Sequence, residues 1–190
     1  MKAHLQQYLT SLALLSEADV HYSLAAFSPI SIKKGNFLVR QGEVCDQAAF
    51  IVIGGVKSFS SDKTGNENII CFRFENEFTT SFESYFFRRP SPKSIQAIEA
   101  CVLLRITPAR LRNLLERIPA WDIILQELVR QELIAREKYL LAYHNKPARE
   151  KYLLSLQQAP DLVRRVRAAD LASYLGITER TLTRAKQEAR

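Results

Sequence analysis

The chain is poor in the residues that form covalent cross-links and metal sites. Its 190 residues include three cysteines, three histidines and one methionine, and no two cysteines form a CxxC pair. Cysteines spaced this widely are typical of buried thiols in a reducing compartment and argue against a disulfide framework. The scattered cysteines and histidines predict no metal site and no haem or iron–sulfur cofactor.

Long apolar segments are also missing. No run reaches the roughly 18 residues that a membrane-spanning helix needs. The first residues are amphipathic and lack a small-residue cleavage site, so we expect a helix there and not a signal peptide. We therefore predict a cytoplasmic protein with no membrane partner.

Motifs typical of common enzymes are absent as well. The sequence has no P-loop, no GxSxG and no HExxH motif, and residues 28–107 contain no histidine that could hold a catalytic metal. We therefore expect a protein that is not an enzyme. The hydrophobic content of 47% is nevertheless enough for a folded core.

Glycine is concentrated in one part of the chain. Five of the six glycines lie between residues 35 and 65, among short runs of β-branched and aromatic residues. Strands of about 5–7 residues separated by such turns predict an antiparallel barrel or sandwich over residues 28–107. Within it, Pro90 and Pro92 predict a loop, because proline cannot donate a ladder hydrogen bond.

Helical patterns flank this segment. The leucine spacing near the N-terminus predicts one helix over residues 1–27. Thr107 followed by Pro108 predicts an N-cap and the first turn of a helix over residues 108–117. Asn145 predicts the N-cap of a later helix that ends near Gln158, and a last pair of helices is expected at 167–175 and 178–189.

Positive charge is concentrated toward the C-terminus. The net charge is +7, and residues 146–190 hold ten Lys or Arg against five Asp or Glu, whereas residues 1–145 hold seventeen against fifteen. Clustered positive charge is typical of a protein that binds a polyanion. A solvated basic surface is the alternative interpretation of the charge alone.

The most specific functional pattern covers residues 170–184. It predicts two short helices joined at Gly176, where a positive φ favours glycine, with Thr178 capping the second helix. The leucines expected to face inward are Leu171, Leu175 and Leu182. The outward face of the second helix would then read base edges in the major groove. The predicted DNA-binding residues are Thr178, Glu179, Arg180, Thr181, Thr183, Arg184, Gln187 and, before the motif, Arg167.

An ordinary helical hairpin that packs against another domain is the alternative to this helix-turn-helix. The excess of positive charge in the same segment favours the DNA-binding interpretation.

The longest helical pattern runs from Pro119 to about Tyr143. Its residues repeat at alternating spacings of four and three, which is typical of a heptad seam. A helix of about 25 residues extends about 37 Å, more than one small domain needs to cover its core. We therefore predict that it pairs with a second copy to form a homodimer; a helix buried within its own chain is the alternative. The predicted seam comprises Trp121, Leu125, Leu128, Glu132, Ala135 and Tyr139, and continues to Ala142.

The order of these parts resembles the cyclic-AMP receptor protein and fumarate–nitrate regulator (Crp/Fnr) superfamily. The resemblance covers nearly the whole chain and is most specific at Gly42-Glu43, at Phe50–Val56 and at the helix-turn-helix. It implies an α+β fold with three parts. These are an N-terminal antiparallel β-barrel (a cyclic-nucleotide-binding-like jelly roll) with flanking helices at 1–118, a dimerisation helix at 119–145, and a helix-turn-helix domain at 146–190.

The resemblance also implies a function and partners. The chain would be a homodimeric transcription regulator that binds double-stranded DNA, and RNA polymerase would be a further partner of an activator. By the family's motif, the DNA contacts fall on Thr178, Glu179, Arg180 and Arg184. The alternative function is a ligand-binding regulatory module whose C-terminal helices dock a protein partner and not DNA.

The cyclic-nucleotide site of the family is degenerate in this chain. The family binds ribose through a Gly-Glu pair and the cyclic phosphate through an Arg-Ser or Arg-Thr pair. Alignment places Thr80-Ser81 and Ser91-Pro92 at these positions. A phosphate without a fixed cation binds weakly, so we expect that cyclic AMP is not the effector. The cations that a shifted register would bring to a phosphate are Arg88, Arg89 and Lys93.

Two further departures concern the DNA-binding end. The printed sequence ends directly after the expected recognition helix, where many relatives carry a small β-wing. Positions 179–180 read Glu-Arg where a common family pattern is Arg-Glu, so we expect a different DNA sequence preference.

Overall fold

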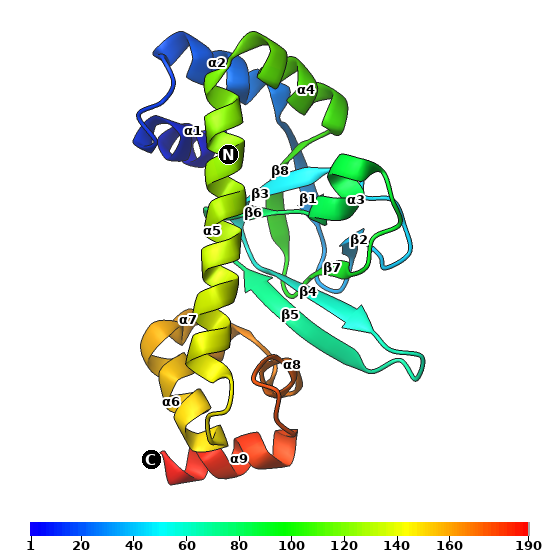
Figure 1. The fold of residues 1–190 in the computed structure, drawn as a ribbon, viewed down its shortest axis with the longest axis vertical. Coiled ribbons are helices and arrows are strands. Elements are labelled where there is room, and N and C mark those ends of the chain that lie inside the picture. The colour runs from blue at the N-terminus through cyan, green and yellow to red at the C-terminus, as the bar shows by residue number, and fades with distance from the viewer. Residues whose placement is uncertain (190) are drawn as a thin grey trace. The chain divides into compact units, whose positions relative to one another are not determined.

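A computed structural model describes residues 1–189 of the chain. The chain divides into two compact units, whose elements Figure 1 labels along the sequence. The first unit comprises Met1–Ser60 and Phe72–Leu128, and the second comprises Ser61–Cys71 and the residues from Val129 onward. The long helix α5 (Ala120–Tyr143) contributes residues to both units.

The strands form two four-stranded sheets, ordered β1-β8-β3-β6 and β2-β7-β4-β5. The pairings of β8 with β1 and β3, of β3 with β6, and of β7 with β2 and β4 are antiparallel. The predicted antiparallel barrel or sandwich over residues 28–107 is therefore confirmed. The strand bounds are β1 (Ser28–Ile32), β2 (Phe37–Val39), β3 (Ala48–Ile53), β4 (Val56–Ser61), β5 (Glu67–Arg73), β6 (Phe78–Thr79), β7 (Ser94–Ala97) and β8 (Cys101–Ile106).

Strand β3 separates the two apolar clusters of the first unit. Ala49 and Ile51 face the cluster inside the barrel, whereas Phe50 and Val52 face the cluster that the helices cover. All four side chains are at most 2% exposed. Burial of a large apolar side chain stabilises a fold by roughly 1.5–3 kcal/mol, so this strand is central to the stability of the unit.

The turn that follows β3 requires a residue without a side chain. Gly54 has a φ of +95°, and a Cβ there would lie 2.7 Å from the carbonyl oxygen of Ala100. Both the backbone conformation and the close approach explain glycine at this position.

The N-terminal segment forms two helices, α1 (Lys2–Ser11) and α2 (Glu17–Ala26), so the single predicted helix is wrong. The break has two local causes. Ala13 adopts a left-handed φ of 53°. Ser16 then caps α2, because its hydroxyl oxygen accepts a hydrogen bond from the Asp19 N–H at 3.2 Å.

A short helix, α3 (Phe82–Phe87), follows β6 and was not predicted. Its aromatic residues favour strands in isolation, so local propensity hides this helix. Arg88 ends it with a left-handed φ of 56°.

The predicted helix over residues 108–117 is confirmed as α4 (Pro108–Arg117), and the Thr107 hydroxyl accepts from the Arg110 N–H at 3.4 Å. The predicted N-cap at Asn145 is wrong. Asn145 has a φ of 58° and α6 (Ala148–Gln158) begins three residues later, directly after Pro147. Left-handed asparagine is typical of a helix C-terminus, which here is the end of α5.

The second unit is largely helical. Beyond α6, it contains α7 (Pro160–Arg165), α8 (Ala168–Tyr174) and α9 (Glu179–Glu188). The predicted pair of helices at 167–175 and 178–189 is therefore confirmed as α8 and α9.

Candidate nucleic-acid interface and sensor site

A tight turn joins α8 to α9. Gly176 has a φ of +65°, its N–H donates to the Ser173 carbonyl, and the Ile177 N–H donates to the Ala172 carbonyl, both at 3.0 Å. This pair of bonds is a Schellman motif, in which glycine takes the left-handed position after the helix end. The prediction of a positive φ at Gly176 is confirmed.

Two further contacts fix the ends of these helices. The Lys151 ammonium of α6 donates to the carbonyl of Leu175 at 2.8 Å, which satisfies an orphan acceptor at the end of α8. Thr178 caps α9, because its hydroxyl oxygen accepts from the Thr181 N–H at 3.2 Å, as predicted.

Helix α9 buries one face and exposes the opposite face. Leu182 and Ala185 are at most 2% exposed, and Leu171 of α8 and Leu175, which directly follows α8, are buried as well. The outward residues predicted to read DNA are exposed, except Thr181, which is half-buried. The exposed set is Thr178, Glu179, Arg180, Thr183, Arg184 and Gln187. These side chains therefore share one accessible face of a short helix, as a major-groove reader requires.

The cations near this face differ in their partners. The Nε of Arg184 lies 3.7 Å from Oε1 of Glu188, and both side chains are at least half exposed, so this ion pair is weak. Arg167 instead forms a fork with Asp170, with Nε–Oδ2 and Nη2–Oδ1 distances of 3.0 Å. The hydrogen bonds and charge of Asp170 raise the pKa of Arg167. Arg167 thus orders the start of α8, and Asp170 offsets much of the charge of this predicted DNA-binding residue.

Helix α8 is anchored to the part of β5 that belongs to the second unit. The Ser173 hydroxyl donates to the carbonyl of Glu67 at 2.8 Å and accepts from the N–H of Ile69 at 3.1 Å. Arg136 of α5 also donates to the carbonyl of Ile70 at 3.3 Å. Side chains of α8 and α5 thus satisfy backbone groups of β5, an edge strand of its sheet.

Two residues of the predicted dimer seam on α5, Trp121 and Tyr139, contact other parts of their own chain. Trp121 is 2% exposed and its indole N–H donates to Ser23 at 2.8 Å. Tyr139 donates to the carbonyl of Tyr174 at 2.5 Å. Trp121 is therefore buried in its own chain and is not available to a second copy, whereas Tyr139 is half-buried and its place in a dimer seam stays a prediction.

The other residues of the predicted seam differ in their exposure. Leu125 and Leu128 are half-buried and line an apolar cavity of about 50 Å³ in the first unit, together with Trp121 and Phe86. Glu132 is half-buried and Ala135 is exposed. The apolar side chains that α5 does expose are displaced around the helix from the predicted seam: Ile123, Val129, Leu133, Ile134, Leu140 and Leu141.

The residues aligned with the family's ribose and phosphate pairs are bonded to one another. Ser81 and Ser91 are at most 2% exposed, and their hydroxyl oxygens lie 2.8 Å apart. Ser91 Oγ is also 2.6 Å from the carbonyl oxygen of Lys93. Thr80 donates to the carbonyl of Gln47 at 3.1 Å. These hydroxyls are therefore satisfied within the protein and do not await a ligand.

Two of the neighbouring cations have partners of their own. Arg88 donates to the carbonyl of Cys45 at 3.0 Å. Arg89 lies 3.7 Å from the Glu83 carboxylate at the surface, and Pro92 is exposed. The Ser81–Ser91 contact itself contains neither a carboxylate nor a guanidinium.

Residues 1–189 contain no group of three or more His, Cys, Asp or Glu side chains placed to hold a metal ion. In the same described part of the chain, no helix combines the length and apolarity needed to cross a membrane.

The sequence does not reveal the roles of two residues that position α8. Ser173 lies within the pattern over residues 170–184, and Lys151 lies within the positively charged segment 146–190. No local signal could identify either role, because each depends on a backbone group more than 20 residues away.

Comparisons with known proteins found one matching domain family and relatives in sequence. Residues 29–118 match the cyclic nucleotide-binding domain family. The chain is 27% identical over 171 residues to the transcriptional activator protein Anr of Pseudomonas aeruginosa, covering 80% of this chain and 66% of that protein. Anr of Pseudomonas protegens matches similarly, at 26% over 167 residues with the same coverage. The chain therefore spans 66% of the length of the curated relatives it matches.

Two solved structures share the fold. FixK2 from Bradyrhizobium japonicum has a TM-score of 0.71 at 18% identity, covering 85% of this chain and 83% of FixK2. The c-di-GMP responsive global regulator CLP of Xanthomonas campestris has a TM-score of 0.73 at 15% identity, covering 91% of both chains. At these identities the likeness concerns the fold alone.

Proposed function

We propose that the chain is a Crp/Fnr-type transcription regulator, which binds double-stranded DNA as a homodimer and acts in the cytoplasm; the match to the cyclic nucleotide-binding domain family and the likeness to the Anr activators support this. The relatives that it matches in sequence are transcriptional activators and not enzymes. An activating role would add a contact with RNA polymerase.

The observation that carries the proposal is the two-sided character of α9. Its exposed face presents Glu179, Arg180 and Arg184, while Leu182 is buried behind them. Arginine can bond guanine O6 and N7 through two N–H groups, and glutamate can accept from cytosine N4. The turn at Gly176 and the cap at Thr178 hold this face in a fixed conformation, which reduces the entropy lost on binding.

Dimerisation is supported by the exposed apolar side chains of α5 in the second unit. Val129, Leu133 and Leu140 lie along one strip of the helix, and Ile134 and Leu141 lie about 100° further around it. A contiguous exposed apolar strip on a helix is typical of an interaction surface. Pairing with a second copy would bury it and would present two α9 helices to a palindromic site.

We further propose that cyclic AMP is not the effector. The Ser81–Ser91 contact joins one residue aligned with the family's ribose pair to one aligned with its phosphate pair, and it supplies no positive charge. Isothermal titration of the full chain with cyclic AMP should show no binding at micromolar concentrations. A micromolar dissociation constant would overturn this part of the proposal.

The decisive experiment is selection of bound duplexes from a random pool by the full chain, with and without a cell metabolite extract. A palindromic consensus is expected, and its affinity should fall steeply between 50 and 200 mM salt, because phosphate contacts release counterions (about 10³-fold for six contacts). Absence of a duplex shift at any salt concentration would contradict DNA binding and favour a protein partner for α9.

A single substitution tests direct base reading. Arg184→Ala should weaken binding to the selected duplex by about 10-fold or more, which corresponds to the ~1–3 kcal/mol of a bidentate base contact. Lys138→Ala on α5 removes the same charge from an exposed position and serves as the control. Equal losses on the selected duplex and on random DNA would show that Arg184 meets only phosphate.

A further inference from the structure

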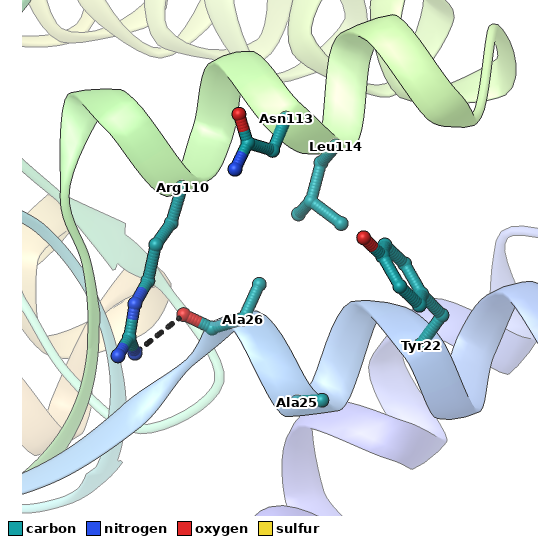
Figure 2. A pocket seen from close by; sticks show the side chains of 6 residues that line it. All are labelled: Tyr22, Ala25, Ala26, Arg110, Asn113 and Leu114. Carbon is teal, nitrogen blue, oxygen red and sulfur yellow. Dashed lines mark hydrogen bonds between the residues drawn. The ribbon is translucent and has the colours of Figure 1, made fainter.

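A hollow of about 240 Å³ lies between α2 and α4 in the first unit. Figure 2 shows its lining, with Tyr22, Ala25 and Ala26 on α2, and Arg110, Asn113 and Leu114 on α4. The hollow exists because two alanines stand on the α2 side, where larger side chains would fill the space between the helices. None of its lining residues belongs to the Ser81–Ser91 contact or to α9.

Arg110 is held in place at one end of the hollow. Its Nη1 donates to the carbonyl of Ala26 at 3.2 Å and to the hydroxyl of Ser28 at 2.5 Å. Because a guanidinium carries five N–H groups, this restraint leaves donors for a further acceptor. A side chain that is already ordered loses little additional entropy when it binds a ligand.

The rest of the lining combines polar donors with apolar surface. Figure 2 shows the Asn113 amide on the Arg110 side of the hollow and the Tyr22 hydroxyl beside Leu114. The Arg117 guanidinium lies 4.1 Å from the centre of the Tyr22 ring, which adds a second positive charge nearby. No acidic residue lines the hollow, so its charge favours an anion.

The volume limits the size of that anion. An engineered apolar cavity of ~150 Å³ holds benzene, and drug-sized ligands occupy ~300–1,000 Å³. A space of about 240 Å³ therefore suits a ligand of about the size of a substituted benzene ring.

We propose that the hollow between α2 and α4 binds a small organic monocarboxylate. The carboxylate accepts hydrogen bonds from Arg110 and Asn113, a charge-assisted interaction that is stronger than a neutral one. The apolar part of the ligand packs against Ala25, Ala26 and Leu114. This site is separate from the degenerate nucleotide site, and its occupation does not depend on DNA binding.

Isothermal titration of the full chain, without DNA, tests the charge requirement. Benzoate is the probe and benzamide is its neutral analogue of nearly the same shape. Benzoate should bind at least about fivefold more tightly than benzamide, because only the carboxylate forms charge-assisted bonds. Equal affinity for the two probes, or no benzoate binding at 10 mM (roughly the weakest affinity a specific site of this kind should show), would overturn the proposal.

Two substitutions test the location. Asn113→Asp is isosteric, lies at an exposed position and places a negative charge beside Arg110, so benzoate affinity should fall at least about tenfold. Gln126→Glu adds the same charge at an exposed position of α5 and should leave it unchanged. Ala25→Leu fills the space from an exposed position and should abolish binding of both probes. Unaltered benzoate binding by Asn113→Asp or by Ala25→Leu would place the ligand elsewhere and overturn the proposal.

Discussion

Asp62 organises the turn between β4 and β5 through its carboxylate. It accepts hydrogen bonds from the hydroxyl and N–H of Thr64 and from the N–H and amide of Asn66, at distances between 2.7 and 3.2 Å. The Thr64 hydroxyl is the largest influence, and together these donors lower the pKa of Asp62 from 3.8 to about 2. A carboxylate that is bonded by backbone and side-chain donors is stabilised in its charged form.

The lowered pKa of Asp62 gives a prediction for a single residue. Because the folded pKa is lowered, the contribution of Asp62 to stability is complete above its unfolded pKa of about 3.9 and is lost as the pH falls toward 2. Thr64→Ala should move the Asp62 pKa back toward 3.8, measured from its carboxyl carbon by NMR titration. An Asp62 pKa near 4 in the unmodified chain would contradict these hydrogen bonds.

Substitutions at two glycines with similar backbone conformations can distinguish the cost of conformational strain from the cost of a steric clash. Gly42 and Gly54 have φ values of +88° and +95°, but a Cβ at Gly42 would meet no atom within 4 Å. Gly42→Ala should cost about 1 kcal/mol through strain alone. Gly54→Ala should cost clearly more, because its Cβ must displace the Ala100 carbonyl. Urea unfolding of both variants measures the difference, and equal costs would refute the close approach.

At the scale of elements, the anchoring of α8 on β5 depends on one hydroxyl. Ser173→Ala removes both bonds to β5, so the Ile69 amide should lose protection from hydrogen exchange. Thr183→Ala is a suitable control, because the Thr183 hydroxyl bonds only to the carbonyl of Glu179 within its own helix. Unchanged exchange at Ile69 in Ser173→Ala would show that the contact does not persist in solution.

Elements were predictable from the sequence where local chemistry decides them. Thr107, Gly176 and Thr178 each define a helix boundary through a cap or a left-handed turn, and the structure has these boundaries where they were predicted. The exposed face of α9 follows from the same periodicity. Local preference, however, failed at α3, whose aromatic residues become helical only through tertiary packing.

Other features depend on contacts between distant segments. Periodicity alone could not decide whether the residues of α5 face a second copy or their own core, and Trp121 faces the core through Ser23, 98 positions earlier. The hollow lined by Ala25 and Arg110 likewise joins segments that no sequence window contains. Sequence patterns thus predicted many of the elements and the exposed face of α9, but not which side of α5 is exposed in the chain.

At the scale of the whole molecule, the exposed strip of α5 predicts self-association. Leu133 is 70% exposed in the single chain, and Leu133→Glu should raise the dimer dissociation constant by about 100-fold or more, because each copy loses ~1.5–3 kcal/mol of apolar burial and gains a charge. Lys138→Glu, at an exposed polar position of the same helix, is the control. Sedimentation equilibrium measures both, and a chain that is monomeric without substitution would contradict dimerisation through α5.

The hydrogen bonds between Ser173 of α8 and strand β5 have a consequence for solubility. A strand at the border of a sheet is a template on which a foreign chain can add itself, and proteins commonly block it with charge, proline or a covering segment. Here a single side chain takes up the outward carbonyl of Glu67 and the outward N–H of Ile69, so that an intruding strand would find both already engaged. We therefore expect α8 to protect this border of the sheet against aggregation.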